Sequence, residues 1–213
     1  RYVILRCTDC GSIFLHPHYW PESFAVYSTG RYFTGYFPDN IHRGGGPDIS
    51  RSRFPAYTRW NYRRKARKFL QMSDLTLSSD LRVLEIGCAS GKLVQGFVDL
   101  GCNACGVDVS RNAIESSSNK KLELYTGLFE DVDFPDYSFD LIVSIETFEH
   151  MGSLDAILGQ IRRKLKRAGR LILQVPNDVD GYRAKFYRHI WWMIPPMHIR
   201  YFTSHSLQQI FSH

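Results

Sequence analysis

Short apolar runs alternate with segments of helical periodicity from about residue 82 onward. The apolar runs have the length of buried strands and are bounded by glycine and polar residues. Strands are predicted at Arg82–Ile86, Ala104–Asp108, Leu122–Tyr125, Leu141–Ile145 and Arg170–Val175. Helices are predicted between them at 91–100, 110–118 and 153–166, with Gly169 in the turn after the last helix. Strands that alternate with helices pair in parallel, so the pattern predicts an α/β fold with helices on both faces of a mostly parallel sheet.

The first fifty residues have a different texture and are predicted to form an N-terminal appendage, residues 1–50. Two short strands are expected at Tyr2–Arg6 and Ser12–His16. An aromatic, glycine-rich stretch follows and ends at the breaker 44–47, so we expect a loop there. Residues 51–213 are predicted to form the main domain, which opens with a helix from about Phe54 to Met72.

Positive charge is concentrated in this opening helix. The net charge of the chain is +6, yet residues 51–68 contain no acidic residue. Their basic residues are Arg51, Arg53, Arg59, Arg63, Arg64, Lys65, Arg67 and Lys68. Tyr57, Trp60 and Tyr62 lie among them, a composition that suits phosphates and stacked bases. The alternative is a solvated helix face whose long side chains cover apolar surface.

Composition argues against a membrane protein or a disulfide-bonded scaffold. No stretch reaches the roughly 18 apolar residues that a membrane span requires, so no membrane partner is predicted. The chain has five cysteines, an odd number, and Cys88, Cys102 and Cys105 fall inside the predicted α/β region. A disulfide framework is therefore not expected, and the predicted location is a reducing cytoplasm.

The strongest local signal is the segment 85–91, EIGCASG, where the first strand of the sheet turns into a helix. Glycines allow the backbone to approach a ligand, and the helix N-terminus offers free N–H groups. The spacing is not that of the dinucleotide fingerprint G-x-G-x-x-G. Glu85 precedes the first glycine by two residues, and its carboxylate suits an ammonium group and would repel a pyrophosphate. The segment therefore favours S-adenosylmethionine over NAD.

Three further elements lie at predicted strand ends. Asp108 ends the second strand, where a carboxylate can bind ribose hydroxyls. Residues 127–130 follow the third strand, and residues 144–146 end the fourth. Each alone is compatible with ordinary turn chemistry. Together they lie where ligands bind in open parallel sheets, beyond the carboxyl ends of the strands.

Residues 82–177 resemble the class I S-adenosylmethionine-dependent methyltransferases, in the branch of ubiquinone-biosynthesis-type O-methyltransferases and of sugar or secondary-metabolite enzymes. The resemblance rests on VLEIGCASG, GVDVS, FPDYSFDLIVSIETFEHM and LKRAGRLILQVPN. It implies a Rossmann-like sheet and S-adenosyl-L-methionine as cofactor. The implied cofactor-binding residues are Glu85, Gly87, Cys88, Gly91, Asp108, Val109, Leu128, Phe129 and Glu146. Glu85, Gly87 and Gly91 would surround the methionine moiety, and Glu146 would lie beside its end. Asp108 and Val109 would contact the ribose and the adenine. Phe129 would face the adenine.

Two residues depart from the family pattern. Ala89 occupies a position where the family prefers glycine. Leu128 occupies the position of an aspartate that bonds the adenine amino group, so the resemblance implies lower cofactor affinity here.

The ends of the chain carry weaker resemblances. Cys7 and Cys10 resemble the second knuckle of relatives with an N-terminal zinc ribbon, whose other cysteine pair lies upstream. Two thiolates do not fill a tetrahedral zinc site, and completion by His16 and His18 is the less favoured alternative, so no metal is predicted. The family's last strands would follow the helix predicted from residue 204, so we expect a fragment that lacks part of the C-terminal strands.

The predicted function is methyl transfer to a small-molecule acceptor such as a sugar, a phenol or a secondary metabolite. If the acceptor hydroxyl must lose a proton, His150 and His198 are the candidate bases. His198 belongs to the aromatic, proline-interrupted segment Asp178–Phe202, which is expected to cover the acceptor pocket. Two alternatives remain open: an RNA methyltransferase that uses the basic helix, and a catalytically weak scaffold paralogue, suggested by Leu128 and the absent strands.

Overall fold

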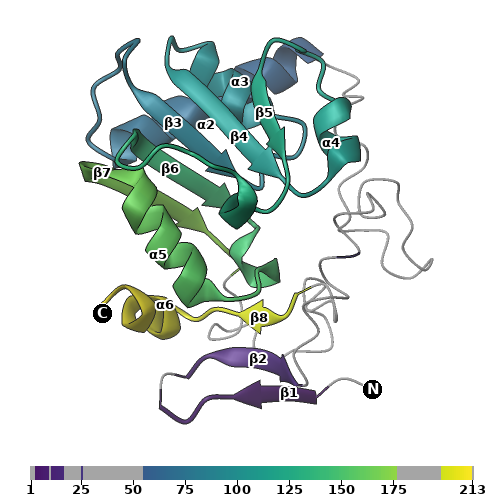
Figure 1. Cartoon of the computed structure of the whole chain (residues 1–213), viewed down its shortest axis with the longest axis vertical. Coiled ribbons are helices and arrows are strands. Elements are labelled where there is room, and N and C mark those ends of the chain that lie inside the picture. Colours follow the sequence, from purple (N-terminus) through teal and green to yellow (C-terminus); the bar gives the residue numbers. More distant parts are fainter. Residues whose placement is uncertain (1–2, 10, 17–24, 26–54, 177–197, 213) are drawn as a thin grey trace.

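The largest element of the structure, a computed structural model, is a sheet of five parallel strands (Figure 1). The structure describes residues 3–9, 11–16, 25, 55–176 and 198–212. Across the sheet the strands are β5 (Glu123–Thr126), β4 (Asn103–Asp108), β3 (Arg82–Ile86), β6 (Phe139–Ile145) and β7 (Leu165–Gln174). Each lies within a residue or two of its predicted position, apart from the start of β7. The predicted parallel α/β fold is confirmed.

Helices cover both faces of this sheet. They are α2 (Pro55–Met72), α3 (Lys92–Val98), α4 (Arg111–Glu115) and α5 (Leu154–Lys164). Alternate residues of a strand point to opposite faces. Val83 accordingly packs in the core beneath α2 and α3, while Leu84 packs in the core beneath α5. Both side chains are almost fully buried, which explains why β3 reads as a continuous apolar run interrupted only by Glu85.

Helices α2 and α3 are in close contact through a glycine. A Cβ atom at Gly96 would lie 2.6 Å from the backbone oxygen of Tyr62. The buried face of α2 consists of Ala66, Phe69 and Leu70. Helix α2 therefore packs directly against α3, the helix that follows β3.

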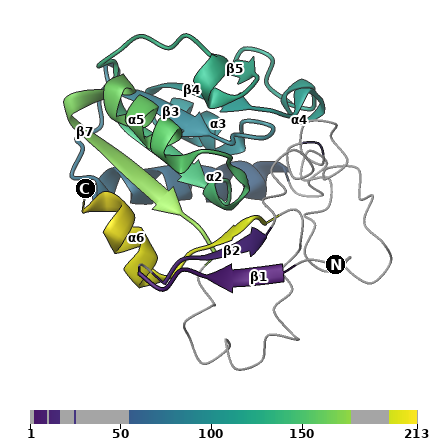
Figure 2. The same cartoon turned by 60° about the horizontal axis from the view of Figure 1, so that its bottom comes forward.

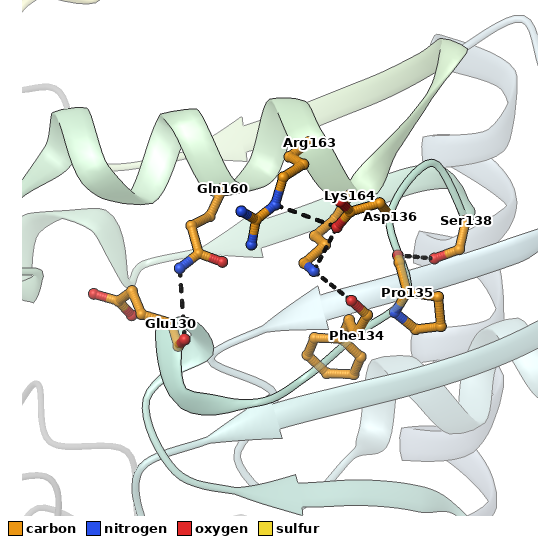
Figure 3. A network of polar contacts seen from close by, with 8 residues as sticks. All are labelled: Glu130, Phe134, Pro135, Asp136, Ser138, Gln160, Arg163 and Lys164. Atoms are coloured by element: carbon orange, nitrogen blue, oxygen red, sulfur yellow. Dashed lines mark hydrogen bonds and ion pairs between the residues drawn. The ribbon is translucent and has the colours of Figure 1, made fainter.

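A buried lysine joins the end of α5 to the segment before β6 (Figure 3). The Lys164 ammonium donates to the backbone oxygen of Phe134 and, at 2.7 Å, to Asp136. Arg163 contacts the same Asp136 carboxylate at 3.2 Å, and the hydrogen bond from Lys164 is the main reason that the Asp136 pKa is lowered. Because each partner of Lys164 is a hydrogen-bond acceptor, its burial is compensated.

The end of α5 differs from the prediction. The helix was expected to reach residue 166 and to be followed by a turn at Gly169, but α5 ends at Lys164 and β7 begins at Leu165. The register shifts: Phe139 pairs with Leu165, and two residues later Leu141 pairs with Arg170. Gly169 lies in the resulting bulge, where a Cβ atom would come within 2.9 Å of the Phe139 oxygen. A glycine is therefore needed at this position, but the reason is a bulge in β7 and not a turn after the helix.

A second, antiparallel sheet lies beyond the carboxyl ends of the main sheet (Figures 1 and 2). Its strands are β1 (Val3–Arg6), β2 (Ile13–His16) and β8 (Arg200–Tyr201), followed by helix α6 (Ser204–Phe211). The strands β1 and β2 were predicted, but their pairing with β8 was not. The proposed division at residue 50 remains a prediction, because residues 26–54 lie outside the described residues.

Two other predictions fall partly or wholly outside the described residues. Of the expected cover Asp178–Phe202, only residues 198–202 are described. Cys10 and His18 are not described, whereas Cys7 is a free cysteine. Among the described helices, none has the length and apolar character needed to cross a membrane.

The contact at Gly96 predicts opposite effects for two alanine substitutions. Gly96→Ala should lower the free energy of unfolding by about 1–3 kcal/mol, because the new methyl group meets backbone atoms of α2. Gly159→Ala is the matched control, since a Cβ at Gly159 in α5 meets nothing within 4 Å. It should stabilise the protein by about 0.5–1 kcal/mol through helix propensity. Denaturant titration measures both, and equal shifts would contradict the close packing of α2 on α3.

Candidate functional site

The loop between β3 and α3 holds two glycines in left-handed conformations. Gly87 has φ 79° and Gly91 has φ 74°. A Cβ at Gly87 would lie 2.1 Å from the Thr147 Oγ1 atom, so the loop is pressed against the turn that follows β6. Ala89, where the resemblance prefers glycine, also has a positive φ of 47°. That conformation costs a non-glycine residue roughly 1–2 kcal/mol, which explains the preference.

Glu85 carries a buried carboxyl group at the end of β3. The residue is 6% exposed, and its Oε2 atom has no hydrogen-bond partner among the residues that the structure describes. Burial raises the pKa of Glu85 to about 8, although the positive charge of Lys65 and a hydrogen bond from the Val94 backbone act in the opposite direction. A positively charged ligand group beside it would stabilise its ionised form.

Helix α2 contributes a cation that the sequence analysis did not assign to the site. Lys65 is half-buried; burial lowers its pKa, while the charges of Glu85 and Glu146 act against this shift. Its ammonium lies 5.7 Å from the ring centre of Phe69, one helical turn further on. Lys65 had been assigned to the general basic face of the helix. Its helical phase next to the apolar Ala66 and Phe69 was the signal that separates it from the exposed arginines.

Asp108 ends β4 and binds the glycine loop directly. One carboxylate oxygen accepts a hydrogen bond from the Ala89 N–H at 2.8 Å, and the other accepts one from the Ser110 N–H at 2.8 Å. Burial raises the pKa of Asp108, and these two hydrogen bonds oppose the shift. Asp108 therefore has a structural role that the sequence did not predict. Each oxygen keeps a second lone pair that can accept from a ligand hydroxyl.

The side chain of Cys88 is directed into the core. Cys88 is 4% exposed. A Cβ atom placed on Gly106 in β4 would lie 2.6 Å from the Cβ atom of Cys88. Burial raises its thiol pKa well above the ordinary value. Of the predicted cofactor-binding residues, Cys88 can therefore offer a ligand its backbone only.

The predicted adenine side contains Val109 and Leu128, both half-buried, and Phe129. Phe129 opens the short 3-10 helix η2 (Phe129–Asp131), is 3% exposed and stacks on Phe134 with ring centres 6.2 Å apart. Its ring thus belongs to the core beneath α5. Its role against the adenine remains a prediction.

Glu146 is exposed at the carboxyl end of β6, in a left-handed conformation with φ 50°. Its side chain accepts a hydrogen bond from the Gln174 amide at 3.1 Å, and its N–H donates to the Gln174 backbone oxygen at 2.8 Å. Strain of this kind in a non-glycine residue concentrates at functional sites. The predicted strand-end residues Glu85, Asp108 and Glu146 therefore lie at the same edge of the sheet.

The two predicted histidines lie together next to the small sheet. His150 ends the 3-10 helix η3 (Phe148–His150), His198 precedes β8, and their ring centres are 4.7 Å apart. His198 is buried, and this burial, reinforced by the charge of His150, lowers its pKa to about 2. Glu149 is 1% exposed, and its burial raises its pKa to about 8. The backbone oxygen of Glu149 accepts a hydrogen bond from Ile199 at 3.0 Å, which joins η3 to the small sheet.

Comparison with known proteins identifies the domain. A family model described as a methyltransferase domain matches residues 57–213. A ubiquinone biosynthesis O-methyltransferase of Bradyrhizobium sp. (strain ORS 278) is 31% identical over 109 residues, covering 48% of this chain and 43% of that protein. The uncharacterized methyltransferase YcgJ of Bacillus subtilis (strain 168) is 27% identical over 144 residues, covering 62% and 55%. The chain thus spans about half the length of these curated relatives.

Solved structures share the fold. A SAM-dependent methyltransferase from Archaeoglobus fulgidus superimposes with a TM-score of 0.59 at 21% identity, covering 72% of this chain and 67% of that one. The YcgJ protein of Bacillus subtilis gives 0.57 at 23% identity, covering 70% and 66%. The class I methyltransferase fold predicted from the sequence is confirmed.

The hydrogen bonds of Asp108 predict a stability effect that the sequence did not. Asp108→Ala should lower the free energy of unfolding of the ligand-free protein by about 1–3 kcal/mol, because the Ala89 and Ser110 N–H groups lose their acceptor. Asp108→Asn keeps one carbonyl oxygen and should cost less. Thermal unfolding of the three proteins provides the measurement, and an unchanged melting temperature for the alanine variant would show that these hydrogen bonds do not stabilise the fold.

Proposed function

We propose, on the premise that this chain belongs to the methyltransferase-domain family, that it transfers a methyl group from S-adenosylmethionine to a small-molecule acceptor. The observation that carries the proposal is the buried Glu85 carboxyl at the end of β3, one atom of which has no hydrogen-bond partner among the described residues. A ligand with an ammonium and a sulfonium group supplies the positive charge that this carboxyl lacks. A pyrophosphate would add a like charge.

The other strand ends suit the remaining parts of that cofactor. The glycine loop 87–91 lets the ligand approach the backbone, and Asp108 retains lone pairs for ribose hydroxyls. Leu128 and Phe129, which follow β5, are proposed to border the adenine. The positive charge of Lys65 favours the ionised form of Glu85, but burial outweighs it in the ligand-free protein.

Catalysis by this chain is proposed to depend mainly on position. When bound, S-adenosylmethionine supplies an electrophilic methyl group on a positively charged sulfur. The protein holds the acceptor atom in line with that methyl group, which replaces a bimolecular encounter by an oriented one. His150 and His198 are our candidates for contacting the acceptor. The lowered pKa of His198 means that its ring is neutral and offers a hydrogen-bond acceptor to a hydroxyl group.

The burial of polar side chains near His198 favours a small hydroxylated acceptor. His198 is 8% exposed and Tyr201 is 4% exposed, and each has a polar atom without a hydrogen-bond partner among the described residues. Such buried polar atoms suit a small molecule that brings hydroxyl groups with it. The likeness to ubiquinone biosynthesis O-methyltransferases supports the same acceptor class.

A second candidate, RNA methylation, is favoured by one surface. On α2, Tyr57 is 64% exposed and Trp60 is 54% exposed, with ring centres 5.9 Å apart. The Arg64 guanidinium lies 5.6 Å from the Trp60 ring. Exposed aromatic rings next to arginines can stack with bases and bind phosphates. RNA binding of this kind would weaken steeply with salt.

Cofactor affinity should depend on pH through Glu85. Below about pH 8 its carboxyl is protonated in the ligand-free protein, and a cationic ligand favours the ionised form, so binding releases a proton. Affinity should therefore rise by up to about tenfold per pH unit towards pH 8 and then level off. The raised pKa also means that the ligand-free protein loses stability as pH rises from 4.5 to about 8. Calorimetry across this range measures the first effect, and Glu85→Gln, which cannot ionise, should show weaker and pH-independent binding.

Transfer of a labelled methyl group tests the function directly. Sugars, phenols and other hydroxylated small molecules should be methylated, with RNA as the comparison substrate, and cofactor should bind with a dissociation constant of about micromolar. His198→Ala should reduce turnover by up to about tenfold, the effect of losing one hydrogen bond to the acceptor, while cofactor affinity is retained. Methylation of RNA alone would contradict the small-molecule proposal. Cofactor binding with no transfer to any acceptor would favour the scaffold alternative.

A further inference from the structure

Three potential metal ligands converge where the main sheet meets the small sheet. One ligand atom from each of Glu149, His150 and His198 lies within 4.8 Å of the other two. Glu149 is 1% exposed, His198 is 8% exposed and His150 is half-buried. Glu149 and His150 belong to η3, which begins three residues after the end of β6, whereas His198 lies two residues before β8. The group is therefore assembled by the fold from two distant parts of the chain.

Two members of this group, Glu149 and His198, have buried polar atoms without the partners that burial normally requires. Both carboxylate oxygens of Glu149 and the Nδ1 atom of His198 have no hydrogen-bond partner among the described residues. The Nε2 atom of His150 lies 3.8 Å from Glu149 Oε1. An unpaired buried polar group costs about 1–3 kcal/mol. Lys164, in contrast, is also buried, but its ammonium group donates hydrogen bonds to the Phe134 backbone oxygen and to the Asp136 carboxylate.

We propose that Glu149, His150 and His198 bind one divalent ion of the zinc type. Two imidazoles and one carboxylate are a ligand set that such ions accept in proteins, and three protein ligands leave at least one coordination position open.

Binding requires a small contraction of the site. Ligand atoms about 2.1 Å from a tetrahedral ion lie about 3.4 Å from one another, closer than the 4.8 Å limit within which the three atoms now lie. The backbones of η3 and the segment before β8 are joined, because the Ile199 N–H donates to the Glu149 backbone oxygen at 3.0 Å. The proposal therefore assigns the contraction to rotation of the three side chains.

The ion would give the proposed methyl transfer its acceptor activation, a role that rests on the proposed function. Its open position would bind the acceptor's hydroxyl oxygen and make the hydroxyl more acidic, in place of a direct hydrogen bond from that hydroxyl to His198. The hydroxyl proton passes to water, and the oxygen forms a bond to the methyl carbon. The carbon–sulfur bond breaks, its electron pair remains on sulfur, and the cofactor leaves as a neutral thioether.

Metal titration of the full chain without cofactor tests the site. After dialysis against a chelator, calorimetry with Zn²⁺ should show one ion per chain, and Co²⁺ should give the visible absorption of a four-coordinate site. Glu149→Gln and His198→Gln should each weaken Zn²⁺ binding by at least about 100-fold, since even residues behind the ligands contribute 10–100-fold. Glu149→Gln keeps the shape of the side chain, and thermal unfolding of both variants checks that they fold. The matched control is His205→Gln, an exposed histidine on α6, which should bind Zn²⁺ as the unchanged protein does.

A second control variant separates this site from the N-terminal cysteines. Cys7→Ser should leave the tight Zn²⁺ site intact. Zinc binding that disappears in Cys7→Ser, that survives both ligand variants, or that is absent from the unchanged protein would overturn the proposal. Failure of the proposed function would look different: zinc would still bind with the expected variant pattern, while calorimetry with S-adenosylmethionine would show no heat of binding.

Discussion

The contact between the loop after β3 and the turn after β6 is the constraint on which the site depends. These strands are neighbours in the sheet, yet the chain continues from β3 towards β4 and from β6 towards β7, on opposite sides. A crevice forms where strand order diverges in this way. At its base, Gly87 lies so close to Thr147 that no side chain fits between them. Loss of that contact would change the spacing between the ends of β3 and β6, and with it the arrangement of Glu85 and Glu146 that we propose for the cofactor.

Burial of charge alone does not mark a functional site in this protein. Lys164 is buried but bonded to Asp136 and to a backbone oxygen, as Figure 3 shows, and its role is to hold α5 in place. Glu85, Glu149 and His198 are buried with polar atoms that lack hydrogen-bond partners among the described residues. The free-energy cost of burying such atoms without partners is offset by packing in the surrounding core. A ligand that bonds to these atoms would remove that cost. All three lie at or beyond the carboxyl ends of the strands, where a ligand would bind.

Local patterns in the sequence were sufficient for most of the main sheet. The apolar runs of β3 to β6 and the positive-φ glycines of the loop depend on residues close in the chain, so periodicity and composition reveal them. The proximity of Lys65 to Glu85, the hydrogen bond from Ala89 to Asp108 and the pairing of β2 with β8 join distant segments. No local pattern encodes such contacts. Gly169 shows the intermediate case, because the need for glycine was evident but its cause, a bulge against Phe139, was not.

The five residues 146–150 connect the two halves of the proposed chemistry. Their first members are fixed from the cofactor side, since Glu146 bonds to Gln174 and Thr147 packs against Gly87. Their last members are fixed from the acceptor side, since Ile199 of the small sheet bonds to Glu149. One short turn therefore sets the distance between the groups that would hold the methyl donor and those that would hold the acceptor. In-line transfer depends on that distance. The small sheet, which looks peripheral in Figure 2, thus contributes to the site by fixing one end of this turn.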